Sequence, residues 1–469
     1  MRIGWFRSLA VAALLLFIVA AFAAGQAVCR VVQHGQRPNS LVMYGSVLRV
    51  AGRTPLVGPA RSLADQTDLR PYELFSKVEH QLHAYYVEKI QDGTPLALGT
   101  ADWMLDSLGD PYSRFLEAEQ LSAYIRRLKG DYAGIGAALA AQRVPVRGDE
   151  DEVLRDLVRQ EQESGHRPDL LLEAEDINAV ERDGNSEVRY RFHIVVVATA
   201  PGGPAETAGL RPGDVIRKVD GKLVFRRNLD SLDGLLLVPT TGRVKLTVTR
   251  KGATKPVDLE VPLGITHVPP VAARRRDRAG VIAVRTLGPG VAEQVREKVR
   301  EMVATGASGI VLDLRRNGEG DAAEVRSLAS VFIRDGVLLR VKERGGQWRD
   351  VRADASRAVG RAPRLAVLVD GTTAGPAEAV AAALKVRGAG RLFGATTFGL
   401  GSRQALFDAP GKSGVLLTTG LVTAPLPAGG LMDLEGEGVA PDVAVPPGAG
   451  GASDPVLERA VEWIGSGAA

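Results

Sequence analysis

Few side chains in this sequence have the types and spacings that covalent catalysis requires. The C-terminal third offers the hydroxyls of Thr373 and Ser402 and the amine of Lys385. A hydroxyl beside a neutral lysine is one pair of nucleophile and base that enzymes use. No histidine follows His267, which excludes a serine–histidine pair from that part of the chain. Thr373 lies just before Pro376, where a threonine is expected to cap a helix rather than attack a carbonyl.

The sequence shows no recognisable set of residues that would bind a metal or a cofactor. The six histidines lack ligand spacing, and the nearest pair, His80 and His83, has no cysteine or acidic cluster beside it. Cys29 is the only cysteine, so no intrachain disulfide can form. The sequence therefore predicts no metal and no cofactor.

Composition indicates an ordinary globular protein with a slight basic excess. The 469 residues are 45% hydrophobic and 24% charged, with a net charge of +4, which allows several domains with real cores. The densest basic run, Arg274, Arg275 and Arg276, is followed at once by Asp277. We interpret it as a solvated linker and expect no nucleic-acid partner.

The N-terminus carries an export signal. Arg2 and Arg7 precede an uncharged apolar stretch that ends at Cys29, long enough to cross a bilayer as a helix. Residues 1–30 are therefore expected to be a signal peptide or a membrane anchor, and residues 31–70 a linker. Either alternative places the remainder outside the cytoplasm, in a periplasmic or other extracytoplasmic compartment.

Hydrophobic periodicity divides the remainder into four parts. Residues 71–130 have helical spacing, and residues 131–264 read as short strands with turns and an insert at about 143–190. Residues 265–450 alternate continuous apolar strands with helices, the pattern of a largely parallel α/β sheet. Residues 451–469 form a C-terminal helix and tail, with Ser453 as the expected N-cap. The insert opens with acidic residues and an apolar stripe, which predicts a surface helix, or alternatively a lid or docking site.

Five motifs occur in a consistent order along these parts. They lie at residues 110–116, 203–216, 312–320, 397–404 and 438–443. Together they resemble the PDZ-containing C-terminal processing, or tail-specific, peptidases over roughly residues 71 to 464. The resemblance implies a multidomain α/β fold, with an N-terminal helical segment, a PDZ-like β-rich domain with a helical insert, and an α/β peptidase-like core.

The same resemblance shows that the expected catalytic residues are missing. The family uses a serine nucleophile and a lysine general base. Aligning the small-residue stretch on Glu378 places Gly375 at the nucleophile, and aligning the 397–401 segment places Leu400 at the base. An acidic position of the family falls near Val386. Shifting the alignment by one residue brings in Ala374 or Pro376, neither of which has a hydroxyl.

Binding capacity is expected to survive this loss. Ala133, Gly134, Ile135 and Gly136 resemble the PDZ loop that points backbone amides at a C-terminal carboxylate, although a plain strand-entry turn is an equal alternative. Gly318 and Gly320 resemble the glycines of an oxyanion site.

Three functional hypotheses are consistent with these residues. The chain is a noncatalytic pseudoprotease that binds protein C-terminal tails, with an active paralogous protease as a further partner. Alternatively, it is a serine-type peptidase with rewired residues, or a structural subunit that only oligomerises. Fold resemblance alone does not transfer the activity.

Overall fold

The computed structural model describes the chain from the first helix onward, with gaps. The chain divides into two compact units, Met1–Gly93 and Thr94–Ala469. The expected signal or anchor and the linker lie outside the described residues, and no helix within the described part is long and apolar enough to span a membrane. The described residues are 71–86, 90–106, 108, 110, 112–145, 179–183, 186–224, 236–238, 240–253, 255–360, 363–446 and 454–466.

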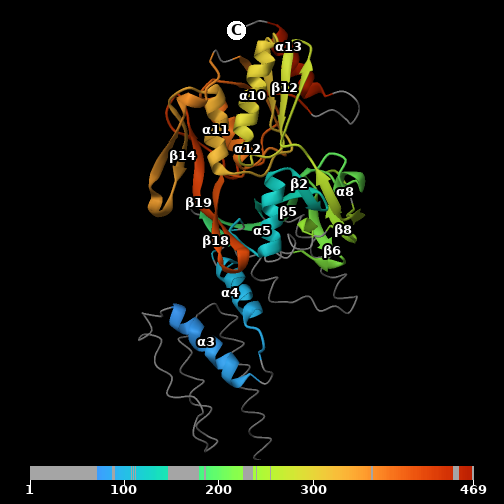
Figure 1. Ribbon diagram of the computed structural model, residues 1–469, viewed down its shortest axis with the longest axis vertical. Helices are drawn as coiled ribbons and strands as arrows, with labels where there is room; N and C mark the ends of the chain where they lie inside the picture. Colours follow the sequence, from blue (N-terminus) through green and yellow to red (C-terminus); the bar gives the residue numbers. More distant parts are fainter. Residues whose placement is uncertain are drawn as a thin grey trace, which may run out of the picture. The chain divides into compact units, whose positions relative to one another are not determined.

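The first unit contributes one described helix, α3 (Pro71–Tyr85), at the position where helical spacing predicted it. The second unit begins with α4 (Thr94–Asp106) and continues to α5 (Ala118–Leu128). Both helices lie within residues 71–130, where helical spacing predicted helices. Figure 1 shows these helices in blue and cyan.

The C-terminal part is built on a six-stranded sheet in the order β11-β12-β13-β16-β17-β21. The β11–β12 pair is antiparallel, and every other neighbouring pair is parallel. Strands buried on both faces have continuous apolar sequences, which is why β13 and β16 could be predicted. The strands are β11 (Val271–Arg276), β12 (Ala279–Val284), β13 (Gly309–Asp313), β16 (Arg364–Val369), β17 (Arg391–Gly394) and β21 (Val443–Ala444).

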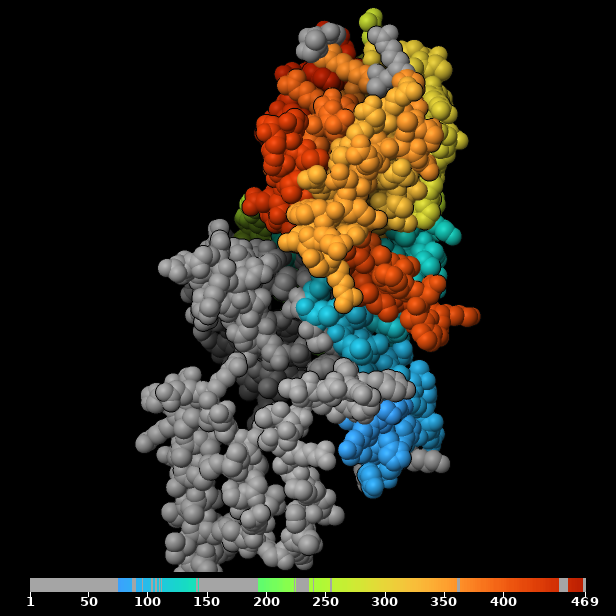
Figure 2. Space-filling view, turned by 90° about the vertical axis from the view of Figure 1, so that its left-hand side faces the viewer, coloured from blue at the N-terminus to red at the C-terminus, as the bar shows by residue number. Residues whose placement is uncertain are grey.

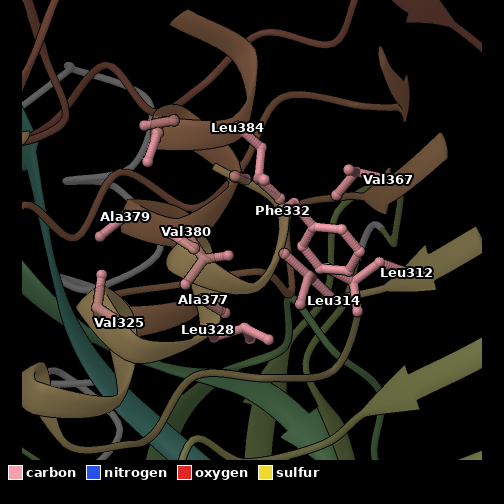
Figure 3. Packing of buried hydrophobic residues seen from close by; sticks show 14 of the residues in the cluster. Leu312, Leu314, Val325, Leu328, Phe332, Val367, Ala377, Ala379, Val380 and Leu384 are labelled. Atoms are coloured by element: carbon pink, nitrogen blue, oxygen red, sulfur yellow. The ribbon is translucent and has the colours of Figure 1, made fainter. Parts of the chain in front are cut away.

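Helices cover both faces of this sheet (Figure 1). Ile310 and Leu312 of β13 belong to the larger core with α10 (Val291–Ala304), α11 (Ala322–Phe332) and α12 (Pro376–Val386). The alternate residue, Val311, packs in a second cluster with α13 (Pro455–Gly465), as the two-residue period of a strand requires. Figure 3 shows the contact between Phe332, Leu384 and the strand residues Leu312 and Val367.

A second, antiparallel sheet packs on α11 and α12, and the sequence did not reveal it. Its order is β1-β19-β14-β15, with β18 and β20 also paired to β19. Strand β1 ties the helical segment to the core, since Phe115 pairs with Val415, and the corresponding cyan and orange surfaces adjoin in Figure 2. The strands are β1 (Arg114–Leu116), β14 (Val337–Lys342), β15 (Trp348–Arg352), β18 (Ser402–Ala409), β19 (Ser413–Pro425) and β20 (Leu431–Asp433).

The predicted β-rich domain is a seven-stranded antiparallel sheet around its own core. The insert begins and ends as strand, because β3 and β5 pair as far as Pro145 and Tyr190; the helix expected within the insert lies outside the described residues. A separate pair joins β2 (Asp131–Gly134) to β10 (Gly264–His267). The elements are β3 (Ala137–Pro145), β4 (Ala179–Asp183), β5 (Ser186–Thr199), α8 (Pro204–Thr207), β6 (Val215–Val219), β7 (Lys222–Leu223), β8 (Arg243–Thr249) and β9 (Val257–Pro262).

Two local predictions were wrong. The arginine run at 274–276 is not a linker but the end of edge strand β11, where Arg275 donates to the Thr305 carbonyl. Charged side chains on an edge strand discourage pairing with another sheet. The cap of α13 is Asp454 rather than Ser453, because the Asp454 carboxylate accepts from the Leu457 amide.

Candidate active site

Gly375 lies where a catalytic elbow would place its nucleophile, between β16 and α12. It is the N-cap of α12, with φ 54° and ψ −119°. Residues other than glycine rarely adopt this backbone conformation because it is strained. Such strained residues occur mainly at functional sites. The backbone therefore keeps an elbow geometry after losing the side chain that would use it.

Leu400 faces Gly375 from the loop between β17 and β18. Its Cδ2 would lie 3.2 Å from a Cβ placed on Gly375. The two positions assigned from sequence to nucleophile and base are thus brought together, and the apolar side chain of one fills space in front of the other. Neither the side chain of Gly375 nor that of Leu400 can accept, donate or transfer a proton.

Glu378 holds the Leu400 loop in place. Its buried carboxylate accepts from the Thr397 hydroxyl and from the amides of Gly399 and Leu400, both at 2.8 Å. Burial raises the pKa of Glu378, and the hydrogen bonds from Thr397, Leu400 and Gly399 partly oppose that shift. The loop that would carry the base keeps its anchor although the base is gone.

Val386 is not part of this arrangement. It closes α12 roughly three helical turns after Gly375, about 16 Å along the axis, and it is buried in the main core. The structure therefore does not bring the predicted acidic position to the cleft. Glu378, which served only to align the sequence, is the acidic residue that contacts the site.

The two oxyanion-like glycines both line a cavity beside Gly375, and Gly318 is the one that adjoins Gly375 itself. Its carbonyl oxygen would be 3.9 Å from a Cβ on Gly375, and a Cβ on Gly318 itself would meet Val197 Cγ1 of the β-rich domain at 2.8 Å. A Cβ on Gly320 would clash with Leu287 at 2.5 Å. Packing against Leu287 thus accounts for Gly320.

Pro376 offers no backbone amide beside Gly375, a point that reasoning from the sequence did not consider. It is the first residue of α12, directly after Gly375. Backbone amides near the nucleophile stabilise an oxyanion, and proline has no N–H. The signal was visible in the sequence as a proline following the nucleophile position.

The hydroxyl of the alternative nucleophile, Thr373, makes hydrogen bonds to the backbone. Its buried hydroxyl donates to the Leu314 carbonyl and accepts from the Asp370 amide. Contrary to the prediction, it does not cap α12. Lys385 is also engaged, since its Nζ donates to the Ala440 carbonyl and lies 3.2 Å from Asp442.

The predicted carboxylate loop follows the separate strand β2, and its Ile135 packs in the core of the β-rich domain. Ala133 and Gly134 end β2, and Ile135 is fully buried. The Ile135 amide donates to the Leu236 carbonyl at 2.7 Å, and a Cβ on Gly134 would collide with that same carbonyl. The Gly136 carbonyl accepts from Ala200. In this structure one of the expected amides is thus satisfied internally.

A cavity of about 120 Å³ adjoins the Gly375–Leu400 contact. It extends between α11, α12 and the antiparallel sheet. Its lining is mainly aliphatic with several polar groups: Tyr112, Arg114, Tyr124, Leu139, Ala140, Gly318, Glu319, Gly320, Ala322, Val325, Leu339, Val341, Val351, Gly375, Pro376, Ala379, Leu400, Ser402, Arg403, Gln404, Val422 and Leu434.

Comparison with known families finds two matches within this architecture. The model of peptidase family S41 matches residues 278–445, and a PDZ domain model matches residues 195–250. The first match contains Gly375 and Leu400. The second lies within the β-rich domain but begins after the loop at 133–136.

Curated relatives and a solved structure extend the similarity to the helical segment. The carboxy-terminal processing protease CtpA of Bacillus subtilis is 26% identical over 81% of this chain and 70% of that protein. A probable CtpA-like serine protease of Staphylococcus aureus is 27% identical over 81% of this chain and 65% of its own length, so the match leaves about a third of that relative uncovered. The photosystem II D1 C-terminal processing protease has 26% identity and a TM-score of 0.58, over 84% of this chain and 91% of that structure.

Proposed function

The chain belongs to the C-terminal processing peptidase family, and we propose that it is an exported, catalytically inactive member that binds the C-terminal tails of other proteins. The observation that carries the proposal is the contact between Gly375 and Leu400. It leaves neither nucleophile nor base where the fold would use them, and Pro376 removes a neighbouring amide donor as well.

The PDZ domain supports the proposal that the protein binds C-terminal tails. A PDZ domain binds peptides by adding a strand to its sheet and by directing backbone amides at the terminal carboxylate. At Ile135 the Leu236 carbonyl holds the amide. A tail that binds at the loop 133–136 would exchange that internal hydrogen bond for one to its own carboxylate.

Export is proposed from the N-terminal sequence alone. Arg2 and Arg7 before the apolar stretch favour translocation of the residues C-terminal to it, with the chain either released or tethered to the membrane. In that compartment, a tail-binding protein without protease activity would present substrates to an active paralogous protease or withhold them from it.

Peptide binding tests this function directly. We expect the full chain to bind short peptides with randomised free C-termini at least tenfold more tightly than the same peptides amidated at the C-terminus. Mass spectrometry after the incubation should find the peptides uncut. Equal binding of the free and amidated peptides would contradict the proposal that the protein binds C-terminal tails. Cleaved peptides would contradict the proposal that it is catalytically inactive.

A second candidate, a peptidase with rewired residues, has one observation in its favour. Ser402 is one of the residues that line the cavity, and its buried hydroxyl has no hydrogen-bond partner within the described part of the chain. Lys385, the nearest alternative base in the sequence, makes its polar contacts with Ala440 and Asp442. Cleavage lost in a Ser402→Ala variant would favour this candidate.

A further inference from the structure

One hairpin of the α/β core carries most of the excess positive charge of the molecule. Residues 274–278, which end β11 and form the turn into β12, comprise four arginines and one aspartate, a net charge of +3. The whole chain has a net charge of +4, so the rest of the sequence contributes only +1. A charge excess concentrated in this way attracts anionic partners.

Most of these arginines have no role in holding the fold together. Residues 274–278 are all exposed. Arg275 lies toward α10 and donates to the Thr305 carbonyl, while Arg274 and Arg276 project from the opposite face because side chains alternate along a strand. Neither they nor Arg278 make a side-chain hydrogen bond or an ion pair with another described residue. Three guanidinium groups are therefore available to a partner.

The amino-terminal ends of the parallel strands extend this charged surface. Arg276 of β11 and Arg364 of β16 lie in one row of paired residues that crosses β12 and β13, so three strand spacings, about 14 Å, separate them. Arg391 begins β17, the next strand of the sheet. The Cζ atoms of Arg364 and Arg391 lie 3.8 Å and 5.9 Å from the ring centroid of Trp463 in α13, a helix that lies beside β12 (Figure 1). We call this surface the basic edge: Arg274, Arg276, Arg278, Arg364 and Arg391.

The hairpin offers charge but little shape to a partner. Ala272 is the one exposed uncharged residue of β11 and the turn, and no residue of β11 or β12 lines the cavity described above. Contacts between proteins usually centre on buried aromatic or large apolar residues. A partner that recognises charge over an area, without a pocket, therefore fits this hairpin best.

The arginines also disfavour a second copy of the chain as the partner. Strand β11 is the last strand on its side of the described sheet, so its outer edge could in principle pair with another strand. A β11 strand from a second copy would bring two runs of arginines together, and like charges on paired strands are destabilising. An anionic partner would relieve the repulsion among these arginines.

We propose that the basic edge docks on the surface of an anionic phospholipid bilayer. Its arginines lie along one edge of the sheet, so several of them can face a plane of phosphate groups together. Near such a surface each arginine strengthens binding about fivefold, and the attraction acts over about 10 Å at about 0.1 M salt. Export, proposed above from the N-terminal sequence, would bring the chain to a membrane surface. Tail binding plays no part in this inference.

Flotation of the full chain with lipid vesicles tests the proposal. We expect tighter binding to vesicles of phosphatidylcholine and phosphatidylglycerol than to vesicles of phosphatidylcholine alone. The difference should vanish at about 1 M salt, where the Debye length is about 3 Å. A hairpin variant with Arg274→Gln, Arg276→Gln and Arg278→Gln should lower the ratio of the two affinities about tenfold or more. Residues 1–30 are the same in every variant, so binding through the N-terminus does not account for such a change.

A second triple variant, Arg126→Gln, Arg334→Gln and Arg344→Gln, is the matched control. It removes the same charge from exposed arginines whose side chains have no partner among the described residues. It should leave the ratio nearly unchanged, because charges farther from the lipid than a Debye length are screened. An unchanged ratio in the hairpin variant would overturn the proposal. An equal fall in both variants would also overturn it, since net charge alone would then explain the binding.

Further measurements separate a bilayer from other anionic partners. Lysines in place of the same three arginines should keep the preference, because a plane of charge does not require the bidentate geometry of arginine. Loss of the preference in that lysine variant, or stronger competition by inorganic phosphate than by chloride at equal ionic strength, would indicate a discrete phosphate site and contradict the proposal. Tighter binding of polyglutamate than of anionic vesicles at equal charge would assign the basic edge to an acidic protein instead.

The hairpin variant should bind peptide tails as tightly as the wild type in the absence of vesicles. Failure of lipid docking and failure of tail binding are therefore separate results.

Discussion

At the scale of single residues, the two positions aligned with the family's nucleophile and base form a packing contact. Gly375 keeps a positive φ, and Leu400 fills the adjoining space. A side chain at position 375 would have to accept both the strained backbone and the leucine at 3.2 Å. The absence of a serine is therefore built into the surroundings of the site and is more than the loss of one hydroxyl.

We expect Gly375→Ser alone to lower the free energy of unfolding by about 1–3 kcal/mol, the cost of a strained non-glycine residue. Adding Leu400→Ala should recover the part caused by the close contact, which a double-mutant cycle in urea would measure. Gly371→Ser is the control, because nothing lies within 4 Å of a Cβ there and its φ is not positive. Equal costs at positions 375 and 371 would contradict this account.

Glu378 predicts a pH dependence. Three groups donate hydrogen bonds to the Glu378 carboxylate. In Glu378→Gln, the side-chain N–H would face one of these donors, which should lower the free energy of unfolding by about 1–3 kcal/mol. Because burial raises the folded-state pKa of Glu378 above its ordinary 4.5, the carboxyl's contribution is fully present below that ordinary value and is lost as pH rises through the folded pKa. The stability difference between the wild type and Glu378→Gln should therefore shrink with rising pH in denaturant titrations. A difference that grows with pH would show that the hydrogen bonds outweigh burial.

At the scale of elements, the sequence was informative where apolar residues run continuously. Strands β13 and β16 and helices α10 to α12 lie within residues 265–450, where the sequence predicted apolar strands alternating with helices. The antiparallel sheet was missed because strands such as β15, with the sequence WRDVR, are charged and exposed. Their pairing with distant strands, such as Phe115 of β1 with Val415, has no local signal.

Some features of the candidate site could be predicted from the sequence and others could not. The pair Gly375 and Leu400 could be predicted because each lies in a contiguous motif. The cavity and the isolated hydroxyl of Ser402 could not, because α11, α12 and five strands of the antiparallel sheet, β1, β14, β15, β18 and β19, contribute to the lining together. Val386, near which the family's acidic position falls, is buried in the main core, and its place in the sequence does not show this.

The strand β8 supplies a prediction for the β-rich domain. Arg250, just after β8, donates two hydrogen bonds at 2.7 Å to Asp214, which is 1% exposed. Removing one partner of a buried pair leaves an uncompensated charge, so Arg250→Met should cost about 3–5 kcal/mol. Arg243→Met, at a pair exposed on both sides, should cost no more than about 1 kcal/mol. Similar values in thermal denaturation would contradict the assignment of this pair as structural.

At the scale of the whole molecule, the helical segment, the β-rich domain and the α/β core all remain, while the catalytic pair is absent. Val197 of β5 packs with Ala374 in one cluster, to which Leu400 also belongs. The β-rich domain therefore contacts the loop that would carry the nucleophile.

The most direct test of the central claim is whether the full wild-type chain cleaves an unstructured protein, with products detected by mass spectrometry. A triple variant, Gly375→Ser, Pro376→Ala and Leu400→Lys, restores the nucleophile, the neighbouring amide and the base, and serves as the active comparison. We expect no products from the wild type and cleavage by the triple variant. Products from the wild type that disappear in Ser402→Ala or Thr373→Ala would contradict it.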